Sequence, residues 1–329
     1  MRRDLILGAI RAGRPAVAAR LIRRNDPFPE TALFRAVDLA VSRRKWGDLH
    51  GLSPLARCAG PFAARVWRAL SLWHDHREQA EAALARLGAD HGEHGFNRMG
   101  ARAWRMFLTL PRLSDAQSDG TPPPVFQFWD QNRPDEIAAA MAEWRDAAGE
   151  GYTDYDNQSA AAYINHTAGP TEAALFRAAP HPAIQSDYFR LCRLMTEGGH
   201  YVDADARLGS KLGAIRDHVA GHTVIWLRTR APAMSIANGF LAAPAQAPLV
   251  VEAFAEASRR LASGTPYHVF EYAGPTLLTE TALRLHRAGT LGPVIALTDD
   301  EVSSHAMTQI DAGYKSDDRN WHIWQERRA

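Results

Sequence analysis

Two aspartates separated by one residue follow a short apolar run near the middle of the chain. Asp203 and Asp205 come after His-Tyr-Val at 200–202, which has the composition of a β-strand, and a Gly198-Gly199 turn precedes that run. Carboxylate oxygens are the ligands that Mg²⁺ and Mn²⁺ prefer, and a metal held by such a pair can neutralise a leaving diphosphate. The spacing therefore predicts a divalent-metal site for a nucleoside diphosphate. Asp205 is expected to bind the metal directly, and Asp203 to support ribose or metal-bound water.

A solvated turn is the alternative interpretation of this pair. The chain has 37 acidic residues, so Asp-x-Asp pairs arise by chance, and Asp154-Tyr-Asp156 is a second one. The second pair lies in a stretch rich in Gly, Tyr, Asn and Gln that predicts a loop or a strand edge. The strand and the Gly-Gly turn before Asp203 favour the metal site there.

Asp187 and Arg190 lie three residues apart in a predicted helix, so they share one helix face. A carboxylate there can accept hydrogen bonds from sugar hydroxyls, and a guanidinium can hold a diphosphate or a sugar as a planar fork. The alternative is an intrahelical ion pair worth only a few tenths of a kcal/mol.

Histidines elsewhere offer weaker metal candidates. The blocks Trp-His-Asp-His at 73–76 and Asp-His-Gly-Glu-His at 90–94 have no cysteine or further partner at zinc spacing, so we interpret them as solvated helix ends.

The two cysteines, Cys58 and Cys192, form no disulfide framework, and Cys192 is expected to be a small buried thiol. This cysteine usage favours a reducing cytoplasm.

The charge is divided unevenly along the chain. Residues 1–110 carry 19 Lys and Arg against 10 Asp and Glu, whereas the rest carries 19 against 27. No apolar run approaches the roughly 18 to 20 residues of a membrane span, and the first residues do not form a signal peptide. A basic N-terminal part predicts an acidic partner such as an anionic membrane surface, and the acidic remainder is unlike a nucleic-acid reader. We therefore expect a cytoplasmic protein, peripheral to the inner membrane and without a nucleic-acid partner, unless the arginines form only a solvated helix face.

A change of hydrophobic period divides the chain into a helical part and an α/β part. Helical spacing continues through residues 1–112, residues 113–124 form a linker rich in Pro, Ser, Asp and Gly, and strands alternate with helices over residues 125–329. Strands are expected at 124–130, 201–202, 224–227 and 237–241. Helices are expected at 31–42, 62–73, 78–87, 136–147, 159–166, 172–179, 186–196, 249–261 and after 274–279. This alternation predicts an α/β layer fold with a mixed, mostly parallel sheet, and ligands of such folds lie beyond the carboxyl ends of strands.

The central order of residues resembles the sugar-binding segment of one enzyme family. Ser186-Asp187-x-x-Arg190, then Gly198-Gly199, then Tyr-Val-Asp-x-Asp at 201–205 is similar to the DXD segment of retaining glycosyltransferases of the family 32 kind. That family includes bacterial capsular and lipopolysaccharide sugar transferases, and the large clostridial glucosylating toxins share its core. The resemblance implies a GT-A-like nucleotide-sugar-binding domain, a Mn²⁺ or Mg²⁺ cofactor, a nucleotide diphosphate sugar donor and a glycan or lipid-linked acceptor, with retention at the anomeric carbon.

The resemblance covers about 200 residues, from Pro124 to the end of the chain, and assigns roles to further residues. It extends to the opening strand with Gln127 and Trp129, to Asn238-Gly-Phe240, and to Gly274-Pro275 before Thr279. The end of the chain has His322-Ile-Trp324 but lacks the Ser-Trp with which the family usually closes. The residues implied to bind the donor are Gln127, Trp129, Ser186, Asp187, Arg190, Gly199, Asp203 and Trp324. The implied metal ligands are Asp203, Asp205 and His322, and the implied catalytic residues are Asp187, Arg190 and Asn238.

Two other classes of function are compatible with the sequence. A metal-dependent phosphotransferase or hydrolase could use Asp203 and Asp205, but it would need more converging carboxylates than this neighbourhood supplies. A helical-repeat adaptor with a degenerate, inactive transferase domain is the non-enzymatic alternative, because fold does not guarantee function. The chain contains no phosphate-binding loop, dinucleotide fingerprint or nucleophile elbow.

Overall fold

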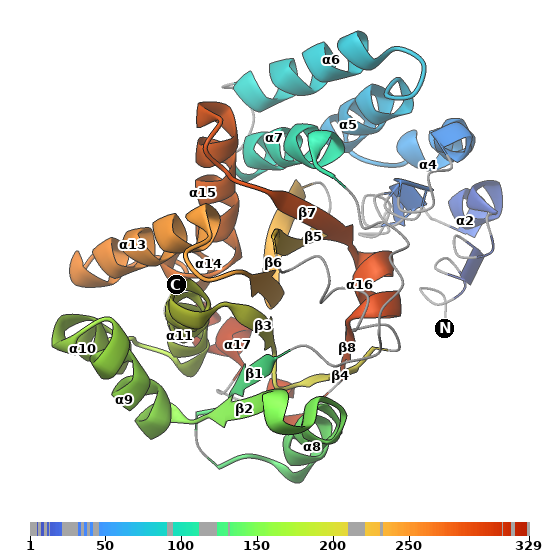
Figure 1. Ribbon diagram of the computed structural model, residues 1–329. Coiled ribbons are helices and arrows are strands. Elements are labelled where there is room, and N and C mark those ends of the chain that lie inside the picture. Colours follow the sequence, from blue (N-terminus) through green and yellow to red (C-terminus); the bar gives the residue numbers. More distant parts are fainter. Residues whose placement is uncertain are drawn as a thin grey trace. The chain divides into compact units, whose positions relative to one another are not determined.

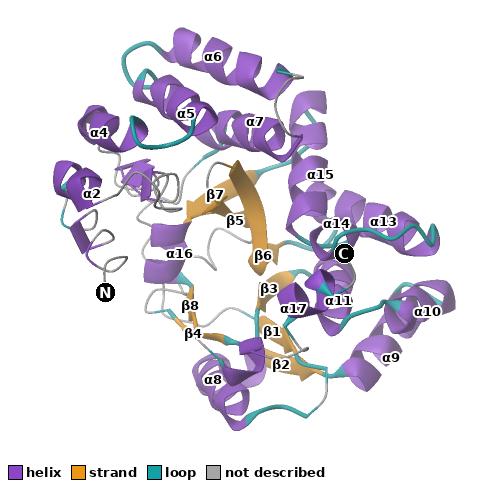
Figure 2. Ribbon diagram, turned by 180° about the vertical axis from the view of Figure 1, so that it is seen from behind, coloured by secondary structure: helices purple, strands orange, loops and turns teal. Residues whose placement is uncertain are grey.

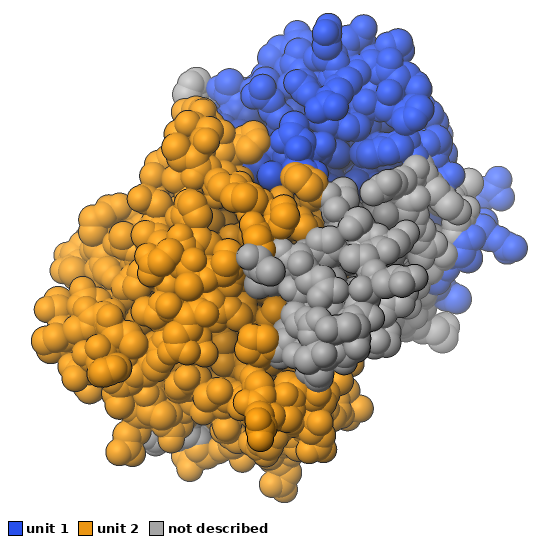
Figure 3. Space-filling model, viewed as in Figure 1, with its two compact units in different colours: residues 1–110, 227–235, 298–300 blue, residues 111–226, 236–297, 301–329 orange. Residues whose placement is uncertain are grey.

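The computed structural model describes residues 46–90, 95–111, 124–130, 132–209, 221–230, 233–310, 312–316 and 320–327, together with 15–21 and scattered positions before residue 46. The chain divides into two compact units, which Figure 3 shows in different colours. Unit 1 comprises residues 1–110, 227–235 and 298–300, and unit 2 comprises residues 111–226, 236–297 and 301–329. Of the predicted linker, only Pro124 lies within the described residues.

Unit 1 contains a series of short helices from the N-terminal part of the chain. Its described helices are α2 (Pro15–Leu21), η1 (Trp46–Leu52), α4 (Ser53–Ala56), α5 (Pro61–Ser71), α6 (Arg77–Ala89) and α7 (Gly95–Thr109). The helix α5 begins with a proline, and its buried residues Phe62, Val66 and Leu70 are spaced four apart, as an amphipathic helix requires. The helices predicted at 62–73 and 78–87 are confirmed; half of the residues of the helix predicted at 31–42 lie outside the described residues, and the other half are helical.

Unit 2 contains most of the strands and the helices that cover them (Figure 1). Its described helices are α8 (Asp135–Ala148), η2 (Gly149–Gly151), α9 (Asn157–Thr167), α10 (Pro170–Ala178), α11 (Pro182–Glu197), α13 (Pro248–Ala262), α14 (Val269–Tyr272), α15 (Pro275–Ala288), α16 (Asp299–His305), η3 (Gly313–Ser316) and α17 (Trp321–Glu326). The strands are β1 (Val125–Phe128), β2 (Tyr152–Tyr155), β3 (Gly199–Val202), β4 (Ala206–Leu208), β5 (Thr223–Arg230), β6 (Ala233–Ala243), β7 (Val294–Thr298) and β8 (Met307–Gln309). Some residues of α16, β5, β6 and β7 belong to unit 1.

The six-stranded sheet has the order β2-β1-β3-β6-β5-β7, and β4 pairs separately with β8. The pairs β1–β2 and β1–β3 are parallel, and the pair β3–β6 is antiparallel. Since β5 ends at Arg230 and β6 begins at Ala233, their connection is too short for a parallel pair. The α/β layer fold with a mixed sheet is therefore confirmed.

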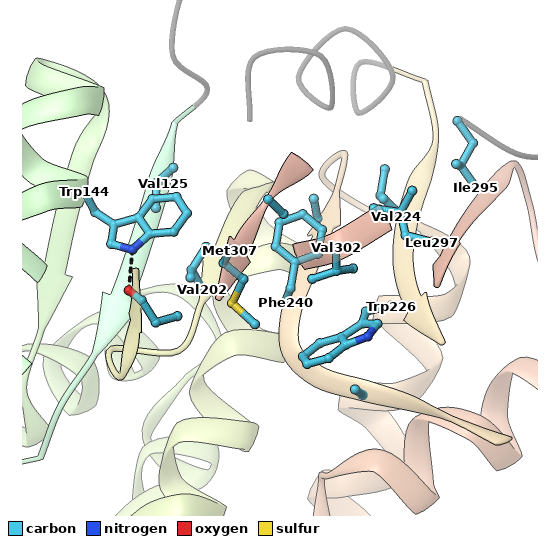
Figure 4. Packing of buried hydrophobic residues seen from close by; sticks show 14 residues of the cluster. Val125, Trp144, Val202, Val224, Trp226, Phe240, Ile295, Leu297, Val302 and Met307 are labelled. Atoms are coloured by element: carbon cyan, nitrogen blue, oxygen red, sulfur yellow. Dashed lines mark hydrogen bonds between the residues drawn. The ribbon is translucent and has the colours of Figure 1, made fainter. Parts of the chain in front are cut away.

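Side chains of β1 and β3 alternate between two faces of the sheet, and each face is covered by a helix. On one face, Val125 and Val202 pack with Trp144 of α8, whose indole nitrogen donates to the carbonyl of Ala206 at 2.7 Å (Figure 4). On the other face, the ring of Phe126 contacts that of Phe189 of α11, with centroids 6.1 Å apart. Figures 1 and 2 show α8 and α11 on opposite sides of these strands. Because α11 covers the second face, residues of β3 with odd numbers point toward it.

Candidate active site

A two-glycine turn carries the chain from α11 directly into β3. Gly198 has a φ of 69°, and a Cβ there would lie 2.6 Å from the backbone nitrogen of Ala245. Gly199 has a φ of 106°, which also disfavours a side chain. The turn therefore requires glycine, and it lets β3 run back beside the helix that carries Asp187 and Arg190.

Asp187 and Arg190 form a buried ion pair that Asn238 completes. The distance from Nη2 of Arg190 to Oδ1 of Asp187 is 2.8 Å, and the two side chains are 3% and 9% exposed. The amide of Asn238, on β6, donates to the same carboxylate oxygen at 2.7 Å, and Arg190 donates to the carbonyl of Asn238. The intrahelical ion pair that the spacing also allowed is therefore present, and it is buried and joined to Asn238 on another element.

Asp203 joins this cluster from the end of β3. Its Oδ1 lies 3.4 Å from Nη2 of Arg190 and accepts a hydrogen bond from the hydroxyl of Tyr201 at 2.9 Å. The guanidinium lies 3.9 Å from the centroid of the Tyr201 ring, and Ser186 is hydrogen-bonded to both residues. Arg190 is therefore held by ionic, hydrogen-bond and cation–π contacts together.

The cluster is open to solvent mainly through Asp203, whose side chain is 27% exposed. Burial raises the pKa of Asp187 to about 7, and Arg190 acts against that rise. Burial and the charge of Asp205 raise the pKa of Asp203, whereas Arg190 lowers it. Two carboxylates thus share one buried cation, and burial favours the protonated form of each.

Two glycines provide the space that these carboxylates occupy. A Cβ at Gly239 would lie 2.6 Å from Oδ2 of Asp203, and a Cβ at Gly274 would lie 2.9 Å from Oδ2 of Asp187. Gly274 immediately precedes the first residue of α15, so the Gly-Pro segment lies beside the ion pair. Neither glycine is singled out as a contact of these aspartates by the sequence.

A break in the alternation of β6 turns Asn238 toward α11. Ala237 and Phe240 both pack in the cluster of Figure 4, although residues three apart in a regular strand face opposite sides. The residues between them therefore depart from regular alternation, which brings the amide of Asn238 to Asp187. Strand periodicity alone could not have placed it there.

The two residues named on β1 have different surroundings. Gln127 is fully buried; its amide donates to the carbonyl of Asp203 at 3.2 Å and accepts from the hydroxyl of Tyr152 at 2.9 Å. Its direct contact is therefore with the backbone of Asp203. Trp129 is half-buried, and its ring lies edge-on to that of Tyr314 with centroids 5.1 Å apart. Contact of either side chain with a nucleotide stays a prediction.

Asp205 has partners of its own. It is 6% exposed, and its Oδ2 lies 2.8 Å from Nζ of Lys315 and 3.0 Å from the hydroxyl of Tyr314. The sequence does not point to Lys315 or Tyr314, because more than a hundred residues separate them from Asp205.

The C-terminal residues named from the sequence lie on α17. Trp324 packs against His181, with ring centroids 5.0 Å apart, and His322 is exposed and stacked on Trp321. The side chain of Gln325 accepts from the backbone of Val269, which holds α17 to α14. Contact of Trp324 with a donor stays a prediction.

The residues described here fit a divalent cation in part. Asp203 and Asp205 supply the oxygen donors that Mg²⁺ and Mn²⁺ prefer, and Oδ2 of Asp203 faces the space left by Gly239. Within the described residues, however, no three His, Cys, Asp or Glu side chains gather closely enough to hold a metal. The structure thus does not bring His322 together with the two aspartates, and its role as a ligand stays a prediction.

Comparisons with known proteins leave the family open. No protein-family model matches the chain, and no curated protein matches it. The chain is similar to a solved structure described as "PaToxG Glycosyltransferase", with 15% sequence identity and a TM-score of 0.37 over 75% of this chain and 96% of that chain. A likeness at this level assigns no function, so the case for function rests on the residues.

Proposed function

We propose that the chain is a metal-dependent glycosyltransferase of the hexosyltransferase type, which moves a sugar from a nucleotide diphosphate donor to a glycan or lipid-linked acceptor. One observation carries the proposal: Asp187, Arg190, Asn238 and Asp203 come from α11, β6 and the end of β3 and meet in one hydrogen-bonded cluster. Such a buried charged cluster costs free energy of desolvation, so a purely structural origin is a poor explanation for it. Its position beyond β3 is also where α/β folds bind ligands.

Each residue of the cluster has a role in this proposal. The carboxylates accept hydrogen bonds from sugar hydroxyls, and the amide of Asn238 donates hydrogen bonds to them. The guanidinium of Arg190 fixes the donor's sugar or diphosphate. Asp203 and Asp205 hold Mn²⁺ or Mg²⁺, which when bound neutralises the charge of the departing diphosphate. Retention at the anomeric carbon follows from the family resemblance, and no side chain is assigned as a covalent nucleophile.

A screen of nucleotide sugars tests the proposal. The full chain is incubated with UDP- and GDP-sugars in Mn²⁺ or in EDTA, and release of the nucleoside diphosphate is measured, because slow hydrolysis of the donor needs no acceptor. We expect the chain to hydrolyse one class of donor when metal is present, and we expect that donor to raise the unfolding temperature of the protein. An intact fold that neither binds nor hydrolyses any of these donors would favour the inactive adaptor instead.

The variant Asp203→Asn is the control for this screen. It keeps the shape of the side chain but removes the charge, so turnover should fall more than tenfold, a barrier change above about 1.4 kcal/mol. The circular dichroism spectrum should remain that of the wild type. A folded variant with wild-type turnover contradicts the role given to Asp203.

A further inference from the structure

The two aspartates of the Asp-x-Asp pair differ in the cation that neutralises them. Asp203 lies 3.4 Å from Arg190, which is buried in the cluster and also bound to Asp187. Asp205 lies 2.8 Å from Lys315, which is on the short helix η3 near the end of the chain. The second aspartate therefore has an ammonium at the place where the proposed function puts a divalent metal.

Lys315 is held in this position by several contacts. Its ammonium also donates to the carbonyl of Ile310, and its own carbonyl accepts from the amide of Asn320 at 2.6 Å. The backbone nitrogen of Ile310 in turn donates to the carbonyl of Asp205 at 2.8 Å. The ion pair is thus part of a connected set of bonds that ties Ile310 and residues 312–316 to the turn after β3.

The neighbour of Lys315 binds the same carboxylate oxygen without a charge. The hydroxyl of Tyr314 donates to Oδ2 of Asp205 at 3.0 Å, and its ring contacts Trp129. The backbone nitrogen of Gly313 donates to Glu136 at 2.6 Å, which fixes the start of η3 to α8. Tyr314 therefore offers a matched comparison, since its removal deletes a hydrogen bond to that oxygen but leaves the ammonium in place.

A metal and an ammonium cannot both occupy Oδ2 of Asp205. Mg²⁺ binds carboxylate oxygen at about 2.0 to 2.1 Å, closer than any hydrogen-bonded ammonium, and two cations on one oxygen repel each other. The carboxylate is only 7% exposed, so solvent screens this repulsion poorly. Direct coordination by Asp205 through this oxygen requires Lys315 to withdraw.

We propose that Lys315 is the resident counter-ion of Asp205, and that a divalent cation must displace it to bind. In the metal-free protein the ion pair fixes the segment of η3, and metal entry releases that segment from the turn after β3. Lys315 then opposes metal binding, so the chain binds the metal alone weakly. The proposal rests on the proposed function for the place of the metal, but it concerns only the competition between two cations for one carboxylate.

Titration of the full chain with Mn²⁺ alone tests this competition, with affinity measured by calorimetry. In the wild type, the charged hydrogen bond from Lys315 to Asp205 must break before Mn²⁺ binds that carboxylate. Lys315→Met has no such bond, so it should bind Mn²⁺ roughly tenfold to a hundredfold more tightly than the wild type. Tyr314→Phe, which keeps the ammonium, should change the affinity less than threefold, and Lys315→Arg should stay close to the wild type. Asp205→Asn should lose the high affinity in combination with Lys315→Met.

Two measurements without a sugar donor add to the titration. In EDTA, Lys315→Met should unfold at a lower temperature than the wild type, and saturating Mn²⁺ should remove the difference. Amide hydrogen exchange in residues 312–316 should speed up when the wild type binds Mn²⁺, and it should not change in Asp205→Asn.

Two outcomes of the titration would overturn the counter-ion role of Lys315. One is a Mn²⁺ affinity of Lys315→Met within threefold of the wild type, and the other is the absence of Mn²⁺ binding in every variant. The transferase proposal fails on different grounds, namely when no nucleotide sugar is bound or hydrolysed. A chain that hydrolyses a donor in EDTA as fast as in Mn²⁺ contradicts the metal dependence of that function, whatever the affinity of the Lys315 variant.

Discussion

At the scale of single residues, Arg190 connects side chains from three elements. Its fork binds Asp187 and Ser186 on its own helix, the carbonyl of Asn238 on β6, and Asp203 after β3. A lysine keeps the charge but cannot make these planar contacts, so Arg190→Lys should lower the free energy of unfolding by about 2 kcal/mol. Urea denaturation measures this change, and catalytic efficiency should fall as well.

An exposed ion pair supplies the control for Arg190. Arg284 lies 3.0 Å from Glu252, and both side chains are about half exposed, at 53% and 47%. The same change, Arg284→Lys, should cost less than about 0.5 kcal/mol, because surface pairs contribute little. Equal and small effects of the two substitutions would mean that Arg190 is not the centre of a buried cluster.

His200 makes the stability of the fold depend on pH. It is 1% exposed, its Nδ1 lies 3.2 Å from the carbonyl of Pro124, and burial lowers its pKa from 6.5 to about 4. Above pH 6.5 the ring is neutral in the folded and the unfolded chain. Between pH 6.5 and 4 the unfolded chain binds a proton at this residue that the folded chain does not, so the contribution of His200 to stability falls as the pH falls.

The size of this effect follows from the pKa difference. Between pH 7 and pH 5, the wild type should lose about 2 kcal/mol of unfolding free energy more than His200→Phe, which keeps a ring of similar size but cannot titrate. Urea denaturation at the two pH values measures the difference. A slope in His200→Phe as steep as that of the wild type would show that other groups cause it.

At the scale of elements, β6 leaves room for a carboxylate of the candidate site because one of its residues has no side chain. Gly239 lies opposite the carboxylate of Asp203, and Gly239→Ala would bring a Cβ to within 2.6 Å of its Oδ2 unless the side chain moves. The obstacle is the end of a flexible side chain, so we expect a stability loss near 1 kcal/mol but at least a tenfold loss of donor turnover. Gly221→Ala is the control, because no atom of the described residues lies within 4 Å of its Cβ position. Full turnover in Gly239→Ala would contradict the placement of Asp203.

Much of unit 2 can be predicted from sequence because its helices carry local signals. Prolines open α10, α11, α13 and α15, and amphipathic spacing continues through each. Of the strands in the described residues, β2, β4, β7 and β8 are not among those expected from the sequence. All five residues of β7 are buried, so no alternation of polar and apolar residues marks it. The polar residues of β2 at 152–155 favour a loop as much as a strand at the edge of the sheet.

Some residues of the candidate site can likewise be found from local sequence patterns, whereas others are revealed only by contacts between distant parts of the chain. Asp187 and Arg190 are found from helical spacing, and Asp203 from its place after a strand. Contacts between residues far apart in the chain, such as Asp205 with Lys315, leave no periodic signal. The position of Asn238 depends on an irregularity in β6 that residue types do not encode. Sequence therefore points to the aspartates and the arginine of the candidate site but not to Lys315 or to the glycine contacts that shape it.

At the scale of the whole molecule, the uneven distribution of charge is the main feature that bears on partners. Residues 1–110 carry nine more basic than acidic residues, and the rest of the chain carries eight more acidic than basic residues. None of the helices in the described ranges has both the length and the apolar composition that a membrane crossing requires. In unit 1, a cavity of about 530 Å³ between α5 and α6 is lined by Arg65, Arg68 and Arg86, by Asp90, which lies 3.4 Å from Arg65, and by apolar side chains.

We expect unit 1 to attach the chain to anionic membranes through such arginines, as a transferase with a lipid-linked acceptor would require. Each arginine near an anionic surface contributes about 1 kcal/mol, and salt weakens the attraction. Reversing two exposed charges with Arg68→Glu and Arg86→Glu should therefore reduce co-sedimentation of the full chain with anionic vesicles at least tenfold at low salt. Arg177→Glu with Arg287→Glu makes the same change in net charge at exposed positions of unit 2, and it should have less than a threefold effect. Equal losses in the two double variants would indicate attraction by net charge alone, and equal binding of the wild type to neutral and anionic vesicles would exclude an electrostatic attachment.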